Sequence, residues 1–148
     1  MREENMSEIR SLYKMSYKFN AAHYTGGNPE NTHVHTFRLR LLILRLSDEY
    51  VDFYDYENKV KALVDHYRGN CINDFEEFSR INPTIENMGI YLFNTLGEMF
   101  KKDGILKLAK LDLGDSPTQS FSVRDTYVIG DVYRPISRER LLKIIGKE

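Results

Sequence analysis

Several features that mark large classes of protein are scarce in this chain. It has a single cysteine, Cys71, so an intrachain disulfide cannot form and a reducing compartment is expected. Its longest apolar runs, such as LLIL, are far too short to span a membrane. The formal net charge is -1 at pH 7, which gives no overall attraction to nucleic acid or anionic lipid. The N-terminal segment MREENMSEIRSLYK is charged and lacks the apolar stretch of a signal peptide, so we expect a cytoplasmic protein that binds neither nucleic acid nor membrane.

Histidines are few as well, but they are concentrated in one place. Three of the four, His23, His33 and His35, fall within the stretch HYTGGNPENTHVH. Residues 13–23 alternate between apolar and polar side chains, which predicts a half-buried strand, and His23 ends the apolar series. Residues 33–46 alternate in the same way, with both other histidines on the apolar parity. The sequence therefore places three imidazoles on the apolar faces of two neighbouring strands.

Such a cluster favours a metal ion. A lone histidine is usually a surface residue or a hydrogen-bonded core residue, and an H-x-H pair alone is a weak signal. Three buried imidazoles each carry a polar nitrogen that costs free energy unless it is bonded, and one shared ion would satisfy all three. Three neutral imidazoles suit Zn²⁺ and leave a fourth coordination position open, as in catalytic zinc sites.

The middle of the chain predicts two helices. An apolar stripe over residues 56–67 is typical of a helix that buries one face. A second helix is expected to begin after Thr84, which has the side chain of an N-cap, and to end at Asp103 and Gly104. Residues 49–53 are interpreted as a short strand or as the segment that leads into the first helix.

The last third predicts two more strands. Residues 105–115 form a third strand whose apolar positions change parity after Leu108, which indicates a bulge. The turn SPTQ leads into a fourth strand at 121–129, and residues 137–148 resemble a terminal helix capped by Ser137. The order β-β-α-α-β-β predicts an α+β domain in which two helices pack on an antiparallel sheet.

The other ionisable residues have ordinary explanations when each is taken alone. Asp65 and His66 end the first helix, where the helix dipole favours a cation, although a carboxylate beside an imidazole also suits proton transfer. Glu86 is a first-turn glutamate, Asp115 a turn residue and Glu30 a solvated loop carboxylate. Cys71 has the ordinary explanation of a small apolar side chain.

Taken in order, however, the motifs FNAAH, HVH, YVDF, VDH, IND, PTIEN and DSPT resemble the 6-pyruvoyl-tetrahydropterin synthase and 6-carboxytetrahydropterin synthase family. The resemblance covers residues 13–128 and leaves 1–12 and 129–148 as terminal extensions. It implies the tunnelling fold, a four-stranded antiparallel sheet with two helices packed on one face. It also implies a homo-oligomer, a trimer or hexamer, with sites between subunits.

The resemblance implies roles for particular residues. Zinc would be bound by His23, His33 and His35, in agreement with the strand-face argument. His66 would take part in proton transfer, with Asp65 orienting its ring. Thr84 and Glu86 would hold the pterin, whose ring N–H and amino group form a donor pair that a carboxylate matches. The substrate would be 7,8-dihydroneopterin triphosphate or a related pterin.

The sequence departs from the family pattern where the chemistry occurs. Members usually have a catalytic cysteine shortly before an H-G-H motif, whereas here the loop has no cysteine and the motif is H-V-H. Glu30 is the only ionisable side chain in that loop and could act as the base, as in a subgroup that yields a hydroxymethyl pterin. Cys71 is a less favoured substitute. Asp115 stands where a glutamate usually anchors the pterin and is one methylene shorter.

The sequence thus predicts a zinc-dependent lyase that abstracts a proton from a pterin side chain and then eliminates or cleaves it. Two alternatives remain open. One is aldolase-like cleavage to 6-hydroxymethyl-dihydropterin, and the other is a pterin or purine binder without catalysis.

Overall fold

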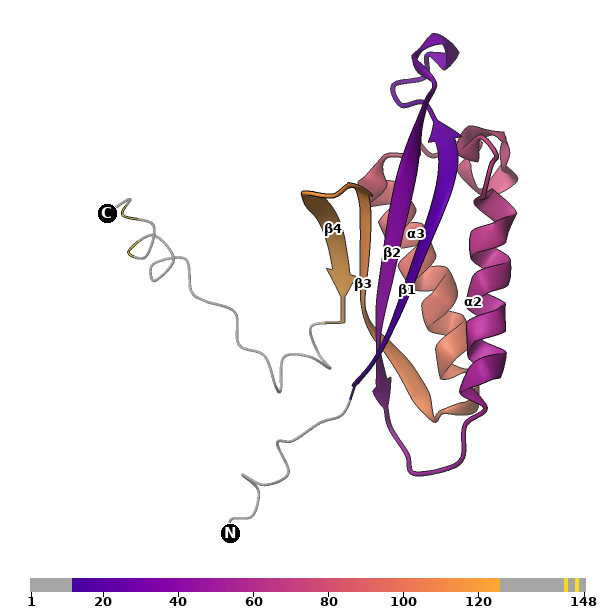
Figure 1. The fold of residues 1–148 in the computed structure, drawn as a ribbon, viewed down its shortest axis with the longest axis vertical. Coiled ribbons are helices and arrows are strands. Elements are labelled where there is room, and N and C mark those ends of the chain that lie inside the picture. Colours follow the sequence, from indigo (N-terminus) through magenta and orange to yellow (C-terminus); the bar gives the residue numbers. More distant parts are fainter. Residues whose placement is uncertain (1–11, 126–142, 144–145, 147–148) are drawn as a thin grey trace.

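The computed structural model describes residues 12–125, together with 143 and 146 (Figure 1). Its four strands are β1 (Leu12–His23), β2 (His33–Arg45), β3 (Leu106–Ser116) and β4 (Gln119–Arg124), and its two α-helices are α2 (Phe53–Tyr67) and α3 (Ile85–Phe100). Short 3-10 turns lie between them: η1 (Pro29–Asn31), η2 (Ile72–Asp74), η3 (Glu76–Phe78) and η4 (Lys101–Asp103). The predicted order β-β-α-α-β-β is confirmed. Except for residues 143 and 146, the expected terminal helix over 137–148 lies outside the described residues, as does the end of the fourth strand at 126–129.

The four strands form one antiparallel sheet in the order β1-β2-β3-β4, and both helices lie on the same side of it (Figure 1). Helix α2 contacts β1, whereas α3 contacts β3 and β4. Pairing between β1 and β2 runs without a break from Leu12 opposite Leu44 to His23 opposite His33. The α+β fold expected from the sequence, with two helices packed on one face, is therefore the observed one.

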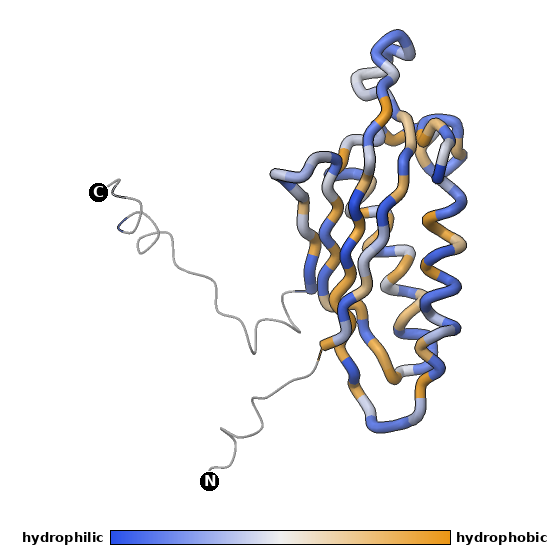
Figure 2. Tube along the Cα trace, viewed as in Figure 1, coloured by the Kyte–Doolittle hydropathy of each residue, from blue (hydrophilic) through white to orange (hydrophobic). Residues whose placement is uncertain are grey.

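The core lies between the sheet and the helices, and the sequence pattern explains it. Hydropathy alternates along the strands, as Figure 2 shows, so that one face of each strand is apolar. The helices contribute stripes at helical spacing. Buried members of the core include Phe19, Phe37, Leu39, Leu41, Val60, Val64, Met88, Leu92, Leu96, Leu111 and Leu113. Burial of each such side chain contributes about 1.5–3 kcal/mol, and it is this packing that holds the helices in place.

The change of parity in the third strand is a bulge, as predicted. Leu42 pairs with Lys110 and Ile43 with Leu108, so Ala109 has no partner on β2. Leu108 and Ala109 are both buried, and the carbonyl of Ala109 accepts a hydrogen bond of 3.0 Å from the backbone N–H of Asp125. The extra residue lets apolar side chains on both sides of the bulge point into the core.

The helix ends agree with the sequence except at the start of α2. The Thr84 side chain accepts a hydrogen bond from the backbone N–H of Asn87, and Gly104, with φ of 74°, follows η4. Residues 49–53 form no strand, so they are the segment that leads into the helix, and α2 begins at Phe53 rather than at residue 56. Asp55 in the first turn favours this earlier start through the helix dipole. None of the described helices is long and apolar enough to cross a membrane.

The β3–β4 hairpin leaves no room for a side chain at Gly114. A Cβ there would lie 2.7 Å from the backbone oxygen of Gln119, so Gly114→Ala must displace the hairpin. We expect a loss of about 1–3 kcal/mol in the free energy of unfolding, measured by urea denaturation. The matched control is Gly97→Ala in α3, where nothing lies within 4 Å, and a gain of up to about 1 kcal/mol is expected there. Equal stability of the two variants would contradict this account of Gly114.

Candidate metal centre

The three clustered histidines converge at one end of the sheet. His23 lies directly opposite His33 in the antiparallel register, and His35 lies opposite Ala21. The ring centroids are 4.7 Å apart for His23 and His33, 5.2 Å for His23 and His35, and 4.6 Å for His33 and His35. One ring nitrogen from each residue falls within 4.8 Å of the other two. The strand parity read from the sequence thus brings the three imidazoles together.

Hydrogen bonds orient two of these rings. Nδ1 of His23 lies 2.8 Å from the carbonyl oxygen of Pro83, and Nδ1 of His33 lies 2.7 Å from that of Asn31. A carbonyl oxygen only accepts, so each Nδ1 carries the hydrogen and each Nε2 keeps its lone pair while the ring is neutral. Metal-binding histidines in proteins typically donate their other ring N–H in this way, which fixes both tautomer and orientation.

Burial keeps His23 in the form that binds a metal. The side chain is 3% exposed, whereas His33 and His35 are more accessible. Burial lowers the pKa of His23, and the Pro83 carbonyl and the Asp115 carboxylate oppose this effect only partly. The neighbouring histidines His33 and His35 lower the pKa of His23 further. The ring is therefore neutral at pH 7.

The donor set fits zinc. Three imidazole nitrogens within reach of one another are ligands that Zn²⁺ prefers, and three protein ligands leave a position for substrate or water. A carboxylate stands nearby, since Oδ2 of Asp115 lies 3.9 Å from Nε2 of His35. That distance is beyond a hydrogen bond, so Asp115 borders the cluster without being bonded to this ring.

The loop between β1 and β2 carries Glu30 away from this cluster. The loop projects beyond the end of the sheet (Figure 1), and Glu30 lies exposed in η1. Its backbone N–H donates to Oδ1 of Asn28 over 3.0 Å, but within residues 12–125 no hydrogen bond or ion pair is formed by its carboxylate. Glu30 precedes His33 by three residues in the chain, but its side chain does not join the group of three histidines.

Asp65, expected to orient His66, contacts two cations in the structure, and its role toward His66 stays a prediction. Asp65 accepts from Lys61 over 2.6 Å and from Arg68 over 3.0 Å, both on the same side of the helix. These two cations lower the pKa of the Asp65 carboxyl group. Adjacent residues of an α-helix point in different directions, so the carboxylate of Asp65 does not face the ring that follows it.

The carboxylate that faces His66 belongs to Glu77 instead. Oε2 of Glu77 lies 3.4 Å from Nε2 of His66. Glu77 was missed in the sequence because it lies in η3, a separate short turn, and no periodicity relates a turn residue to the end of a helix. The only available signal was the richness of the segment FEEF in acidic and aromatic residues, which is too common to predict a contact.

The cluster of three histidines and His66 lie at the same end of the molecule, but they form separate sites. The chain after α2 is tied to the end of β1, because the N–H of Gly69 donates to the carbonyl of Asn20 over 2.7 Å and that of Ala22 to the carbonyl of Asn70 over 2.9 Å. Even so, the group of potential metal ligands found among the described residues contains His23, His33 and His35 and not His66.

Comparison with known proteins identifies the family. Residues 12–126 match the family model described as 6-pyruvoyl tetrahydropterin synthase. The chain belongs to this family. No curated protein matched the sequence at the level of significance applied.

Solved structures of the family have the same fold. The match to 6-pyruvoyl tetrahydropterin synthase from Caenorhabditis elegans has a TM-score of 0.65 at 19% identity and covers 79% of this chain and 99% of that one. The Plasmodium falciparum 6-pyruvoyl tetrahydropterin synthase gives a TM-score of 0.52 at 20% identity, with 78% and 98% covered. A catalytic-residue mutant of the Plasmodium vivax 6-pyruvoyltetrahydropterin synthase, glutamate to alanine, gives 0.50 at 20% identity, again with 78% and 98% covered. Membership of the family supports a function of the pterin lyase type.

The two residues expected to hold a pterin begin α3, next to the histidines. The carbonyl of Pro83, which bonds His23, immediately precedes Thr84. The Thr84 hydroxyl oxygen accepts from the N–H of Asn87 over 3.1 Å, so its own hydrogen remains available to a ligand. Glu86 is exposed in the first turn. Contact with a pterin stays a prediction for both Thr84 and Glu86.

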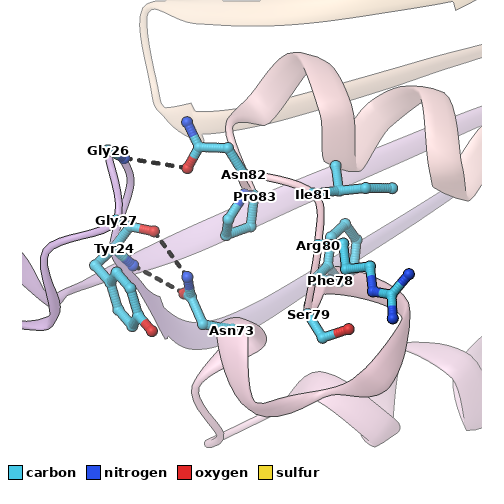
Figure 3. A pocket seen from close by; sticks show the side chains of 10 residues that line it. All are labelled: Tyr24, Gly26, Gly27, Asn73, Phe78, Ser79, Arg80, Ile81, Asn82 and Pro83. Carbon is cyan, nitrogen blue, oxygen red and sulfur yellow. Dashed lines mark hydrogen bonds between the residues drawn. The ribbon is translucent and has the colours of Figure 1, made fainter.

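A pocket adjoins this end of the molecule (Figure 3). Its volume is about 390 Å³, and Pro83 forms part of its wall, so it lies beside His23. Asn73 and Asn82 hold its rim together. Asn73 exchanges hydrogen bonds of 3.0 and 2.9 Å with the backbone of Tyr24, and Asn82 accepts one of 3.2 Å from the N–H of Gly26 (Figure 3). The volume is in the range of small-molecule sites.

Cys71 lies near the same rim without joining the metal ligands. Its Sγ lies 3.8 Å from Oδ1 of Asn73, and it is half-buried. Its backbone forms a parallel bridge with Ala22, the residue before His23. Within the described residues it does not belong to the group that could hold an ion.

Zinc binding tests the assignment of the three histidines. We expect the wild-type protein to bind one zinc ion per chain, and His33→Ala to bind it at least about tenfold more weakly because one of three ligands is lost. His66→Ala is the matched control, since it removes the one histidine outside the cluster and should leave zinc binding unchanged. Metal analysis after dialysis and competition with a chelator provide the measurement. Equal zinc content in both variants, with native circular dichroism, would contradict the assignment.

Proposed function

We propose that the protein is a zinc-dependent lyase that acts on 7,8-dihydroneopterin triphosphate or a closely related pterin. The reaction would begin with removal of a proton from the side chain and continue by elimination or cleavage. The observation that carries the proposal is the group of three converging imidazoles, two of them oriented by backbone carbonyls, in a chain of the pterin synthase family.

In this proposal His23, His33 and His35 hold the metal. Bound there, zinc supplies Lewis acidity toward the oxygens of the substrate side chain. The protein supplies the geometry, because the bonds from Nδ1 of His23 to Pro83 and from Nδ1 of His33 to Asn31 fix both rings before any ligand binds.

Glu86, Thr84 and Asp115 would bind the pterin. The bond between His23 and the Pro83 carbonyl fixes the start of α3 against the metal ligands, so Thr84 and Glu86 are held close to them. The exposed carboxylate of Glu86 can accept from the paired N–H groups of the pterin. Asp115, 3.9 Å from Nε2 of His35, would contact the ring from β3.

Glu30 and His66 would move protons. The Glu30 carboxylate forms no bond within the described residues and is available as a base in the loop before His33. A glutamate is the catalytic residue replaced in the Plasmodium vivax mutant, which supports the use of a carboxylate in this family. His66 does not reach the metal ligands of its own chain. The trimer or hexamer implied by the resemblance would bring His66 of one copy to the metal ligands of another.

The presence of Glu30, and the absence of a cysteine from the same loop, favours one alternative among the enzymes. A carboxylate base near a side-chain hydroxyl suits aldolase-like cleavage, which would yield 6-hydroxymethyl-dihydropterin. The two reactions differ in the mass of the pterin product, so a single assay distinguishes them.

Product analysis tests the proposed reaction and the base together. We expect zinc-loaded protein to consume 7,8-dihydroneopterin triphosphate, with the product identified by mass spectrometry. Glu30→Gln should lower kcat by about a hundredfold or more and leave the dissociation constant of the pterin unchanged, because only the base is lost. Glu57→Gln, an exposed glutamate of α2, is the matched control. Absence of turnover by the zinc-loaded wild type would contradict the proposed enzymatic function and favour a protein that binds a pterin or purine without catalysis. An active Glu30→Gln would contradict the assignment of the base.

A mixing experiment tests the shared site. His35→Ala and His66→Ala should each be inactive as homo-oligomers. When the two are co-expressed with different tags and purified as mixed oligomers, random mixing should restore about a quarter of the sites, since each site then draws one intact histidine from each copy. Mixed oligomers that remain inactive would show that His66 does not act across a subunit boundary.

A further inference from the structure

Glu77 joins His66 to the core of the protein. Its Oε2 accepts a hydrogen bond from the hydroxyl of Tyr67 and lies 3.4 Å from Nε2 of His66. Tyr67 is 3% exposed, whereas 47% of the His66 side chain is exposed. One carboxylate oxygen therefore connects a buried donor to an accessible imidazole.

Aromatic packing fixes the turn that carries Glu77. The ring of Phe75 lies 4.3 Å from that of His66 and 5.0 Å from that of Tyr67, measured between centroids. Phe78, at the other end of η3, packs against Tyr67 at 6.1 Å. Glu77 lies between these two phenylalanines in the chain, so their packing places it over the end of α2 rather than leaving it on a mobile loop.

The charges at this position favour an ionised Glu77 and a protonated Tyr67. Burial raises the pKa of Tyr67 strongly, Glu77 raises it further, and Tyr91 adds to the effect from α3. Burial also acts to raise the pKa of Glu77, but the Tyr67 hydroxyl and His66 outweigh it, so that the pKa falls below its usual value. The other charged groups at this end of α2 are Asp65 and the two cations that bind it, Lys61 and Arg68.

We propose that Glu77, held in place by Tyr67, is the positioning residue for His66, so that Nε2 carries the hydrogen and Nδ1 is the nitrogen that exchanges protons with the substrate. A carboxylate only accepts hydrogen bonds, so it selects the Nε2–H tautomer and leaves the lone pair on Nδ1. A proton taken up at Nδ1 gives an imidazolium that faces the Glu77 carboxylate, and its release returns the ring to the same tautomer. The inference rests on the proposed function in one respect, namely that His66 moves a proton.

The consequence for Asp65 is a different role from the one implied by the resemblance. Its carboxylate is already bonded to Lys61 and Arg68, and Nη1 of Arg68 also donates to the carbonyl of Lys18 over 3.0 Å. Asp65 thereby orients an arginine that ties α2 to β1. Asp65 and Glu77 can be separated experimentally, because the two carboxylates have different partners.

Histidine NMR gives a test that needs no turnover. The chain has four histidines, so the imidazole signals can be assigned by substitution. We expect His66 of the wild type to be the Nε2–H tautomer when neutral, as read from the two ring ¹⁵N shifts. In Glu77→Gln the fraction of the Nε2–H tautomer should fall, because an amide that can also donate replaces a carboxylate that only accepts. In Asp65→Asn the tautomer fraction of His66 should change by less than half as much.

The matched control is Glu76→Gln, the same chemical change at the neighbouring exposed residue of η3, and it should leave His66 unchanged. If Glu77→Gln does not fold, Glu77→Asp keeps the charge but withdraws it by one methylene, and a smaller fall in the same direction is expected. A wild-type Nδ1–H tautomer would overturn the inference. So would a larger effect of Asp65→Asn than of Glu77→Gln.

Kinetics separate this inference from the proposed function. With an active wild type, Glu77→Gln should lower kcat by about tenfold at unchanged KM, whereas Glu76→Gln should leave both unchanged. If the NMR results hold and the wild type has no turnover, then Glu77 orients His66 and it is the proposed lyase function that fails. If turnover is present and kcat is the same in Glu77→Gln, the positioning role is overturned.

Discussion

The antiparallel pairing of β1 with β2 is the constraint on which the candidate site depends. The register is unbroken and sets His23 opposite His33, with His35 two residues along the same face. A slip of one residue would turn one strand's side chains to the other face of the sheet, which would separate His23 from the other two. The apolar residues of the same faces, such as Phe19 opposite Phe37, resist such a slip because it would expose them. The interactions that stabilise the core therefore also position the candidate metal ligands.

The hydrogen bond between His23 and the carbonyl of Pro83 connects the sheet to the helical layer. It connects the end of β1 to the residue before the N-cap of α3. An imidazole that donates to a backbone carbonyl satisfies its own polar group in a buried site, and it also fixes the position of the loop that carries Thr84. The sheet and the helix that would supply pterin contacts are thus held together through a side chain that is itself a candidate metal ligand.

The sequence correctly predicted those structural features that follow directly from a repeating pattern of residues. Alternation predicted the strands and the shared face of His23, His33 and His35, and a change of parity predicted the bulge at Ala109. The sequence did not predict contacts made by turns and loops, because their side chains follow no repeating pattern. The resemblance implied that Asp65 orients His66, yet the carboxylate that faces this ring is that of Glu77, because the packing of Phe75 places η3 over the end of α2. Glu30 shows the same limit, because a loop residue has no parity from which its direction could be read.

The three candidate metal ligands differ from the other proposed site residues in how much of the chain must be ordered to bring them together. All three belong to one hairpin and fall within thirteen residues, whereas Thr84, Glu86 and Asp115 come from α3 and β3. Closing a short loop is entropically cheaper than bringing distant segments into contact. Metal affinity would then depend mainly on the β1–β2 hairpin, with Pro83 orienting one ring from the helical layer, whereas substrate affinity would depend on the whole fold. Partial unfolding of the helical layer would remove the proposed pterin contacts and release the His23 ring from Pro83, but it would leave the three histidines together on one hairpin.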